Sequence, residues 1–182
     1  MGAWLGDGSR KSGRISSNDQ EIANHIRQAG YSVIERQART SLVFTIKGLV
    51  FGLRHCGIFG KGARDKYIPQ NYLENHKEVR KETLRGLLDT DGTVTKEGNI
   101  SFCSVSEQLA NDVAWLARSL GGMARVHKYL KKSNFTSGHK YKDVIAFVVS
   151  LTLPDDKWFY IERKQARVRS ISQKRYLWRW ID

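Results

Sequence analysis

A repeat within the chain constrains its fold more than any other feature. The segment Glu21-Ile22-Ala23-Asn24-His25-Ile26 resembles Gln108-Leu109-Ala110-Asn111-Asp112-Val113, which lies 87 residues later and has the same Ala and Asn. Each copy follows a serine and precedes a glycine: Ser17 and Gly30 around the first, Ser104 and Gly121 around the second. Serine at the start and glycine at the stop are N-cap and C-cap signals, so we predict the same helix twice.

A short apolar run that ends in Asp-Gly stands upstream of each predicted helix. The first run is Trp4-Leu5-Gly6-Asp7-Gly8, and the second is Leu87-Leu88-Asp89-Thr90-Asp91-Gly92. Asp7 and Asp91 are 84 residues apart, so the second copy has about three extra residues in the hairpin that follows.

Between these anchors the apolar residues alternate with a period of two, which predicts strands. The predicted strands are 14–16, 31–36, 42–46, 99–104, 124–130 and 143–153, with further helices at 50–55 and 155–162. The order helix, two strands, helix, two strands, helix then occurs twice, which indicates an α+β fold with antiparallel sheets. We predict a first half-domain of residues 1–74, with a connecting segment 56–74, and a second of residues 75–182 that ends in a basic helix or tail.

The charge of the chain predicts an anionic partner. Its 182 residues include 31 Lys plus Arg against 18 Asp plus Glu, a formal net charge of +13. Such an excess favours binding to a polyanion, and a role in solubility alone is the alternative. No apolar run reaches the ~18 residues of a membrane span, and the start of the chain lacks a signal-peptide pattern. We expect a cytoplasmic or nucleoid-associated protein, leave organellar and nuclear locations open, and expect no membrane partner and no small-molecule substrate.

If the two Asp-Gly runs are helices, Asp7 and Asp91 lie at their C-termini, each followed by a glycine in the left-handed cap position. A carboxylate is unfavourable at this negative end of a helix unless a cation lies opposite. Small residues would let the two helices pack closely: Gly2, Ala3, Gly6, Gly86 and Thr90. Both carboxylates would then meet the last carbonyl groups at one place that suits a hard divalent cation. One Asp-Gly pair is an ordinary turn signal, but its recurrence in a repeat favours the cation site.

These residues resemble a known family. The run Leu84-Arg85-Gly86-Leu87-Leu88-Asp89-Thr90-Asp91-Gly92 resembles the signature of LAGLIDADG homing endonucleases, and Gly2 to Ser9 resembles the first copy in double-motif, monomeric members. The stretch between them is most similar to intein-encoded members, on these residues: Leu53-Arg54, Gly57, Lys66-Tyr67-Ile68-Pro69, Tyr72-Leu73 and Arg80. The resemblance covers nearly the whole chain.

The resemblance implies two pseudo-symmetric αββαββα repeats, with the motif helices packed at the centre and two antiparallel sheets forming a saddle over double-stranded DNA. It also implies a monomer whose active site hydrolyses phosphodiester bonds across the minor groove. By resemblance, Asp7 and Asp91 bind the metal ions, helped by the carbonyls of Gly6 and Thr90. Mg²⁺ is the expected ion, Mn²⁺ is expected to substitute, and Ca²⁺ to bind without supporting cleavage. Asp89 is expected to be a helix-surface or cap residue.

One basic residue in each half assists catalysis in this family. Lys66, 25 residues before Asp91 and next to Ile-Pro, matches the first such position, and Lys164 is the candidate for the second. A solvated or phosphate-contacting side chain is the alternative for each. Two carboxylates that hold Mg²⁺ would permit a two-metal hydrolysis, with lysines stabilising developing charge.

DNA contacts are expected from strands and hairpins, because a two-stranded ribbon fits the major groove. The candidate residues are basic: Arg10, Lys11, Arg14, Arg36, Arg39 and Lys47 in the first half, and Lys96, Arg125, Lys128, Lys131, Lys132, Lys140 and Lys142 in the second. Which of them read bases and which hold phosphates is left open. If each half follows the groove for one turn, the target has roughly 20 base pairs with unlike halves.

Site-specific DNA cleavage is the leading hypothesis. The alternatives are a non-catalytic nucleic-acid binder on the same fold, either an RNA maturase or a DNA-binding regulator, and a basic structural domain. The chain is expected to be an intein or intron product cut from a longer polypeptide, without protein-splicing activity. Its tail has three tryptophans for which core packing or stacking on nucleic acid are both considered: Trp158, Trp178 and Trp180.

Overall fold

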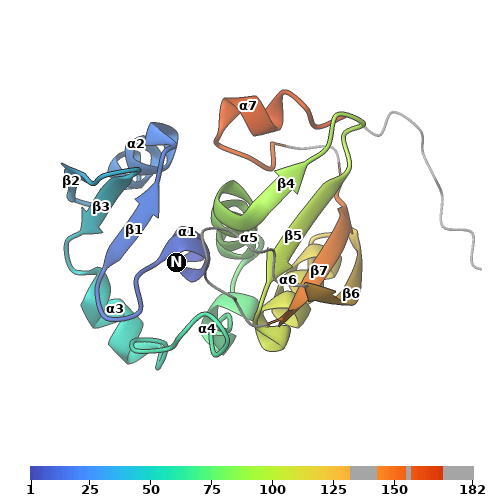
Figure 1. The fold of residues 1–182 in the computed structure, drawn as a ribbon, viewed down its shortest axis with the longest axis horizontal. Coiled ribbons are helices and arrows are strands. Elements are labelled where there is room, and N and C mark those ends of the chain that lie inside the picture. The colour runs from blue at the N-terminus through green and yellow to red at the C-terminus, as the bar shows by residue number, and fades with distance from the viewer. Residues whose placement is uncertain (132–142, 155–156, 170–182) are drawn as a thin grey trace, which may run out of the picture.

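The computed structural model describes residues 1–131, 143–154 and 157–169, and Figure 1 shows the central helices α1 and α5 between two sheets. The first half contains α1 (Gly2–Asp7), β1 (Arg14–Ser17), α2 (Gln20–Gln28), β2 (Val33–Gln37), β3 (Leu42–Ile46) and α3 (Leu49–His55). The short helix α4 (Gln70–Leu73) follows. The second half contains α5 (Lys77–Asp91), β4 (Gly92–Val94), β5 (Ile100–Ser104), α6 (Glu107–Ser119), β6 (Met123–Lys131), β7 (Val144–Thr152) and α7 (Glu162–Gln165).

The sheets confirm the predicted α+β architecture and its repeat. Their strand orders are β1-β3-β2 and β4-β5-β7-β6, and every pairing is antiparallel. The strands β1, β2 and β3 therefore correspond to β5, β6 and β7. In the first half the expected first strand is reduced to one bridge between Gly8 and Ile15, whereas Gly92 pairs with Phe102 in the second. The shorter first hairpin lacks the three residues that extend the ladder.

The two motif helices pack so closely that glycine is required where they meet. A Cβ on Gly2 would lie 2.1 Å from the carbonyl oxygen of Thr83, and one on Gly86 would lie 2.6 Å from the backbone nitrogen of Ala3. The other sides of α1 and α5 carry large apolar side chains that are completely buried, such as Trp4. The contact between these helices is therefore both the centre of the molecule and part of its core.

The repeated helices start two residues later than their serines predict. Ser17 Oγ accepts a hydrogen bond from the Asp19 N–H at 3.1 Å, and Ser104 Oγ accepts one from the Ser106 N–H at 3.0 Å. Each serine closes a turn before the helix, and the N-cap residues are Asp19 and Ser106. The predicted glycine stops are confirmed, since Gly30 and Gly121 have φ values of +89° and +87°.

The helix predicted over 155–162 is wrong within the described residues, because 157–161 are not helical and α7 begins at Glu162. Trp158, Phe159 and Ile161 are all buried in the core, and three such positions within four residues do not share one helix face. Core packing is thus the answer for Trp158, while Trp178 and Trp180 lie outside the described residues. Within the described part of the chain, no helix is both long and apolar enough to cross a membrane.

Candidate active site

The helices α1 and α5 end at the same place, and each ends in an aspartate, Asp7 or Asp91. A Cβ built on Gly6 would lie 3.1 Å from Oδ2 of Asp91, so this carboxylate faces the end of the neighbouring helix. The next glycines are not left-handed as predicted: Gly8 has φ −75° and Gly92 φ −82°. Glycine is needed there for space, because a Cβ would lie 2.1 Å or 2.3 Å from a carbonyl oxygen of the preceding turn.

The carboxyl groups of Asp7 and Asp91 are both partly buried, and the same two lysines act on their pKa values. Burial raises the pKa of Asp7, and the charges of Lys66 and Lys164 oppose the rise. Burial, and then the charge of Asp7, raise the pKa of Asp91 to about 6, again against both lysines. A pair of carboxylates that resist ionisation together is the arrangement that a cation relieves.

Lys66 caps the C-terminus of α1. Its ammonium donates hydrogen bonds to the carbonyl oxygens of Trp4, Gly6 and Gly8, at 3.1, 3.0 and 3.0 Å. The residue is only 5% exposed, and burial lowers the pKa of its ammonium while Asp91 and Asp7 oppose this effect. An ammonium has three protons, so all of them are used on the end of the helix.

Lys164 makes the same cap on α5. Its ammonium donates to the carbonyl oxygens of Leu88, Asp89 and Gly92 at 3.0, 2.6 and 2.7 Å, and the Thr90 oxygen lies at 3.5 Å. The carbonyls of Leu88, Thr90 and Gly92 lie 84 residues after the first set, so both caps obey the repeat. Each lysine places a positive charge at the negative end of a helix dipole.

Asp89 is not the helix-surface or cap residue that the sequence suggested. Its side chain is buried, and its carboxylate accepts the N–H groups of Tyr160 and Ile161 at 3.0 and 3.2 Å. Burial raises the pKa of Asp89 to about 6, and these hydrogen bonds oppose the rise. Asp89 therefore holds the segment that carries Lys164, a contact that the motif's spacing does not reveal.

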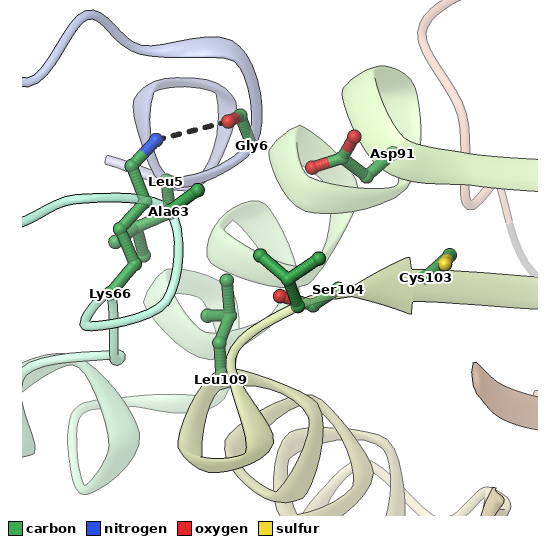
Figure 2. A pocket seen from close by; sticks show the side chains of 9 residues that line it. Leu5, Gly6, Ala63, Lys66, Asp91, Cys103, Ser104 and Leu109 are labelled. Atoms are coloured by element: carbon green, nitrogen blue, oxygen red, sulfur yellow. Dashed lines mark hydrogen bonds between the residues drawn. The ribbon is translucent and has the colours of Figure 1, made fainter. Parts of the chain in front are cut away.

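A pocket of about 230 Å³ opens beside this centre (Figure 2). Asp91 and Lys66 both contribute to its wall, and Figure 2 shows the bond from Lys66 to the Gly6 oxygen there. Cys103 and Ser104, at the end of β5, complete the side toward the second sheet. Among the described residues no group of three or more His, Cys, Asp or Glu side chains gathers to hold a metal. The oxygen donors are thus two carboxylates and main-chain carbonyls, a set that fits a hard divalent cation.

The first sheet carries predicted basic residues on the face away from its core. Arg14 and Ser16 alternate with buried Ile15, so both lie on the outer face. Arg36 lies on the same face as Ser16, because both pair with the same residue of β3. The turns and ends of this half hold the remaining candidates, all exposed: Arg10 and Lys11 before β1, Arg39 between β2 and β3, and Lys47 after β3.

In the second sheet the register separates the candidates. Arg125 and Lys131 are exposed on the face opposite the core, which also carries Ser150 and the half-buried Ser101. Lys128 falls on the other face, because side chains alternate along β6. Lys96 is exposed in the turn between β4 and β5. The candidates Lys132, Lys140 and Lys142 lie outside the described residues.

Sequence reasoning missed two polar residues that share these outer faces, Thr45 and Ser150. Ser150 stands in an otherwise apolar run, so only the pairing of β7 with β5 and β6 reveals its direction.

Comparison with known proteins decides the family. The family model described as a LAGLIDADG-like domain matches residues 78–180, which is more than half of the chain. The chain belongs to the LAGLIDADG family. This membership confirms the resemblance that the two Asp-Gly motifs suggested.

Similar curated proteins match this LAGLIDADG chain over a small part of their own length. The replicative DNA helicase DnaB of Mycobacterium intracellulare is 34% identical over 90% of this chain and 25% of its own. The ATP-dependent DNA helicase Hel308 of Thermococcus kodakarensis is 33% identical over 72% of this chain and 13% of its own. The homothallic switching endonuclease of Saccharomyces cerevisiae is 32% identical over 42% of this chain and 14% of its own. The chain thus spans a quarter or less of these relatives.

Solved structures confirm the fold. A crystal structure of I-DmoI in complex with DNA and Ca has a TM-score of 0.57 at 12% identity and covers 91% of this chain and 92% of its own. Mesophilic variants of the homing endonuclease I-DmoI give a TM-score of 0.53 at 12% identity, with 84% of this chain and 85% of theirs covered. At such identities the likeness establishes the LAGLIDADG fold.

Proposed function

We propose that the protein is a site-specific double-strand DNA endonuclease. It hydrolyses phosphodiester bonds across the minor groove of a long, asymmetric target and requires a divalent metal. The convergence of Asp7 and Asp91 at the ends of two closely packed helices, in a chain of net charge +13, carries the proposal. A protein that only binds nucleic acid has no need of two converging carboxylates whose pKa values burial raises.

In this proposal Asp7 and Asp91 hold the metal, with help from the carbonyl oxygens of Gly6 and Thr90. Each carbonyl oxygen has two lone pairs, so its bond to a lysine leaves one for a cation. Mg²⁺ is the proposed ion, Mn²⁺ substitutes, and Ca²⁺ binds without supporting cleavage. A divalent cation held there would supply an activated water and would stabilise the charge that develops on the phosphate oxygens and on the leaving oxygen.

The lysines act on the site through the helix ends. Because the protons of Lys66 are spent on three carbonyls, this ammonium fixes the last turn of α1 and offsets the negative charge around Asp7. Lys164 does the same for α5. We therefore propose that both lysines support phosphodiester hydrolysis as electrostatic stabilisers.

The basic outer faces of the two sheets hold the DNA across these carboxylates. Arg14 and Arg36 line the first sheet and Arg125 and Lys131 the second, each exposed. The two half-domains, with the boundary proposed at residues 74 and 75, then sit on unlike halves of one target as a monomer. The proposed partner is double-stranded DNA in the cytoplasm or nucleoid.

An origin as an intein- or intron-encoded domain is part of the proposal. The matched helicases are named as different enzymes, DnaB and Hel308, yet this chain matches only 25% and 13% of them. A segment that recurs in unlike hosts is what a mobile endonuclease domain would produce.

Selection of cleaved sites from a randomised duplex library with Mg²⁺ tests the proposal. The wild type should linearise a plasmid that carries the selected site, and Asp7→Asn and Asp91→Asn should each lower the rate by roughly 10³-fold, which is about 4 kcal/mol of transition-state stabilisation. Both variants should still bind the site in Ca²⁺. A wild type that selects no site, or aspartate variants that cut at the wild-type rate, would refute it, and tight RNA binding without cleavage would favour a maturase.

A further inference from the structure

Each capping lysine lies on a segment that the opposite half of the molecule holds. We propose that Ser106 and Asp112 of the second half position Lys66, and that Asp19 and Glu21 of the first half position Lys164. These residues would then set the relative rates at which the two DNA strands are cut. The inference rests on the proposed endonuclease function and adds positioning residues to its site.

The segment around Lys66 is anchored on α6. Ser106 Oγ donates a hydrogen bond to the carbonyl oxygen of Lys66 itself, at 2.6 Å. Two residues further on, the Ile68 N–H donates to Asp112 Oδ2 at 2.8 Å, while Gln108 Nε2 donates to the other oxygen at 2.7 Å. Ser106 and Asp112 are 1% and 5% exposed, so these bonds form away from water. The backbone is thus fixed at the carbonyl of Lys66 and again two residues later.

The segment around Lys164 is anchored on α2. The Arg163 guanidinium forms a bidentate pair with Asp19, with closest approach 2.7 Å, and the Glu162 N–H donates to Glu21 Oε1 at 2.9 Å. The Tyr160 ring stacks on His25 with 3.4 Å between centroids. These contacts join residues more than a hundred positions apart in the chain.

The exchange between halves is reciprocal. Asp19 and Ser106 are the N-cap residues of α2 and α6, which are the same helix in the two copies of the repeat. Each lysine caps the motif helix of its own half, and the segment that carries it contacts α2 or α6 of the other half. A rotation of one half against the other would move the Lys66 segment with α6. It would strain the Lys164 segment, because Asp89 of its own half also holds that segment.

Such anchoring matters because a displacement of about 1 Å at a catalytic centre can cost up to 10²-fold in rate. A lysine side chain has four rotatable bonds, and a backbone shift moves its ammonium out of reach of three carbonyls at once. The burial of the two anchors differs as well: the Arg163 side chain is 60% exposed, whereas Ser106 and Asp112 are buried. Loss of the buried anchor should therefore have the larger effect.

A strand-resolved nicking assay on the selected target tests the inference. Lys66→Met and Lys164→Met should each slow mainly one strand, and these strands should differ. Asp112→Ala should slow the Lys66 strand about tenfold, and Asp19→Ser, which keeps a good N-cap residue, should slow the Lys164 strand about threefold. Asp112→Asn, which keeps an acceptor for the Ile68 N–H, should restore most of the rate. Glu107→Ser, which removes an exposed carboxylate from the first turn of α6, is the matched control and should leave the strand ratio unchanged.

A structural defect alone would slow both strands equally, and that result, or slowing of the strand opposite to the one predicted, would overturn the inference. Urea unfolding gives an answer that does not depend on cleavage. Asp112→Ala combined with Lys66→Met should shift the midpoint by less than the sum of the single shifts, whereas Asp112→Ala with Lys164→Met should be additive. Additivity in both pairs would overturn the inference even for a protein that cuts. A wild type that cuts neither strand would refute the proposed function, and the unfolding cycles would still decide the positioning roles.

Discussion

The two halves build the same cap on their motif helices with different means. In the first half the helix has six residues, and its lysine lies in a segment held by buried side chains of α6. In the second half the helix has fifteen residues. The segment that carries its lysine is tied to α2 through an exposed ion pair and to Asp89 of its own motif helix through a backbone hydrogen bond. Both copies of the repeat keep the contact between a lysine ammonium and the carbonyl groups at the end of the motif helix. The residues that hold each lysine's segment differ between the copies. A function that depends on the end of a helix therefore restricts that end, while the residues that hold the capping segment are free to differ.

The largest expected loss of stability comes from a substitution in the contact between the two motif helices, α1 and α5. Gly86→Ala would place a Cβ 2.6 Å from the Ala3 nitrogen and 3.1 Å from the Gly2 Cα, where only backbone could yield. We expect a loss of about 3 kcal/mol in the free energy of unfolding, measured by urea denaturation. Gly52→Ala is the control: a Cβ there meets nothing within 4 Å, and alanine should stabilise α3 by about 0.5–1 kcal/mol. Equal small effects would contradict the close packing.

The two lysine caps are expected to contribute different amounts to the free energy of unfolding. Methionine fills the space of a lysine stem but leaves the carbonyls of the helix end without a donor. We expect Lys66→Met to cost about 2 kcal/mol and Lys164→Met about 1 kcal/mol in the free energy of unfolding, because buried side chains hold the Lys66 segment whereas an exposed ion pair holds that of Lys164. Equal losses would show that the burial of the anchor is unimportant to the cap.

The smallest expected effect is on the pH dependence of the free energy of unfolding, compared between variants of Asp91 and of Asp89. The pKa of each is raised from 3.8 to about 6 by burial, so their contribution to stability is present below pH 3.8 and is lost as the pH rises through 6. In EDTA, Asp91→Asn should be more stable than the wild type by about 1 kcal/mol above pH 6, and the advantage should vanish near pH 4. Saturating Mg²⁺ should reverse the sign, because the wild type alone keeps both carboxylates for the metal.

Asp89→Asn is the contrasting variant, with the same measurement. The N–H groups of Tyr160 and Ile161 both donate to Oδ1 of Asp89, and an amide oxygen in that place can accept both through its two lone pairs. Asp89→Asn should therefore keep these bonds and gain a similar relief from the removed charge, but Mg²⁺ should not change the ranking. A metal-dependent effect at Asp89 would contradict its separation from the metal site.

Much of the fold followed from local patterns. The strands and repeated helices could be predicted because alternation, glycine stops and turn signals act over a few residues, and the repeat checked each assignment against its copy. The failures have tertiary causes. Residues 157–161 have a helix-compatible composition, yet Asp89 accepts two of their N–H groups and the core takes three of their side chains. Gly8 and Gly92 were expected to relieve backbone strain, but they are needed for space beside carbonyl oxygens.

For the site, the spacing of the motifs by itself determined that Asp7 and Asp91 occupy equivalent places at the ends of two equivalent helices. The sequence also singled out Lys66 and Lys164, on the strength of resemblance. Only the tertiary structure decided what these lysines touch, because hydrogen bonds that span 58 to 76 residues leave no periodic trace in the chain. It likewise decided that Ser106 and Asp19, one in each half, hold the segment of the other's lysine. Local spacing is a property of one helix, whereas the position of an ammonium against a helix end depends on how two halves dock.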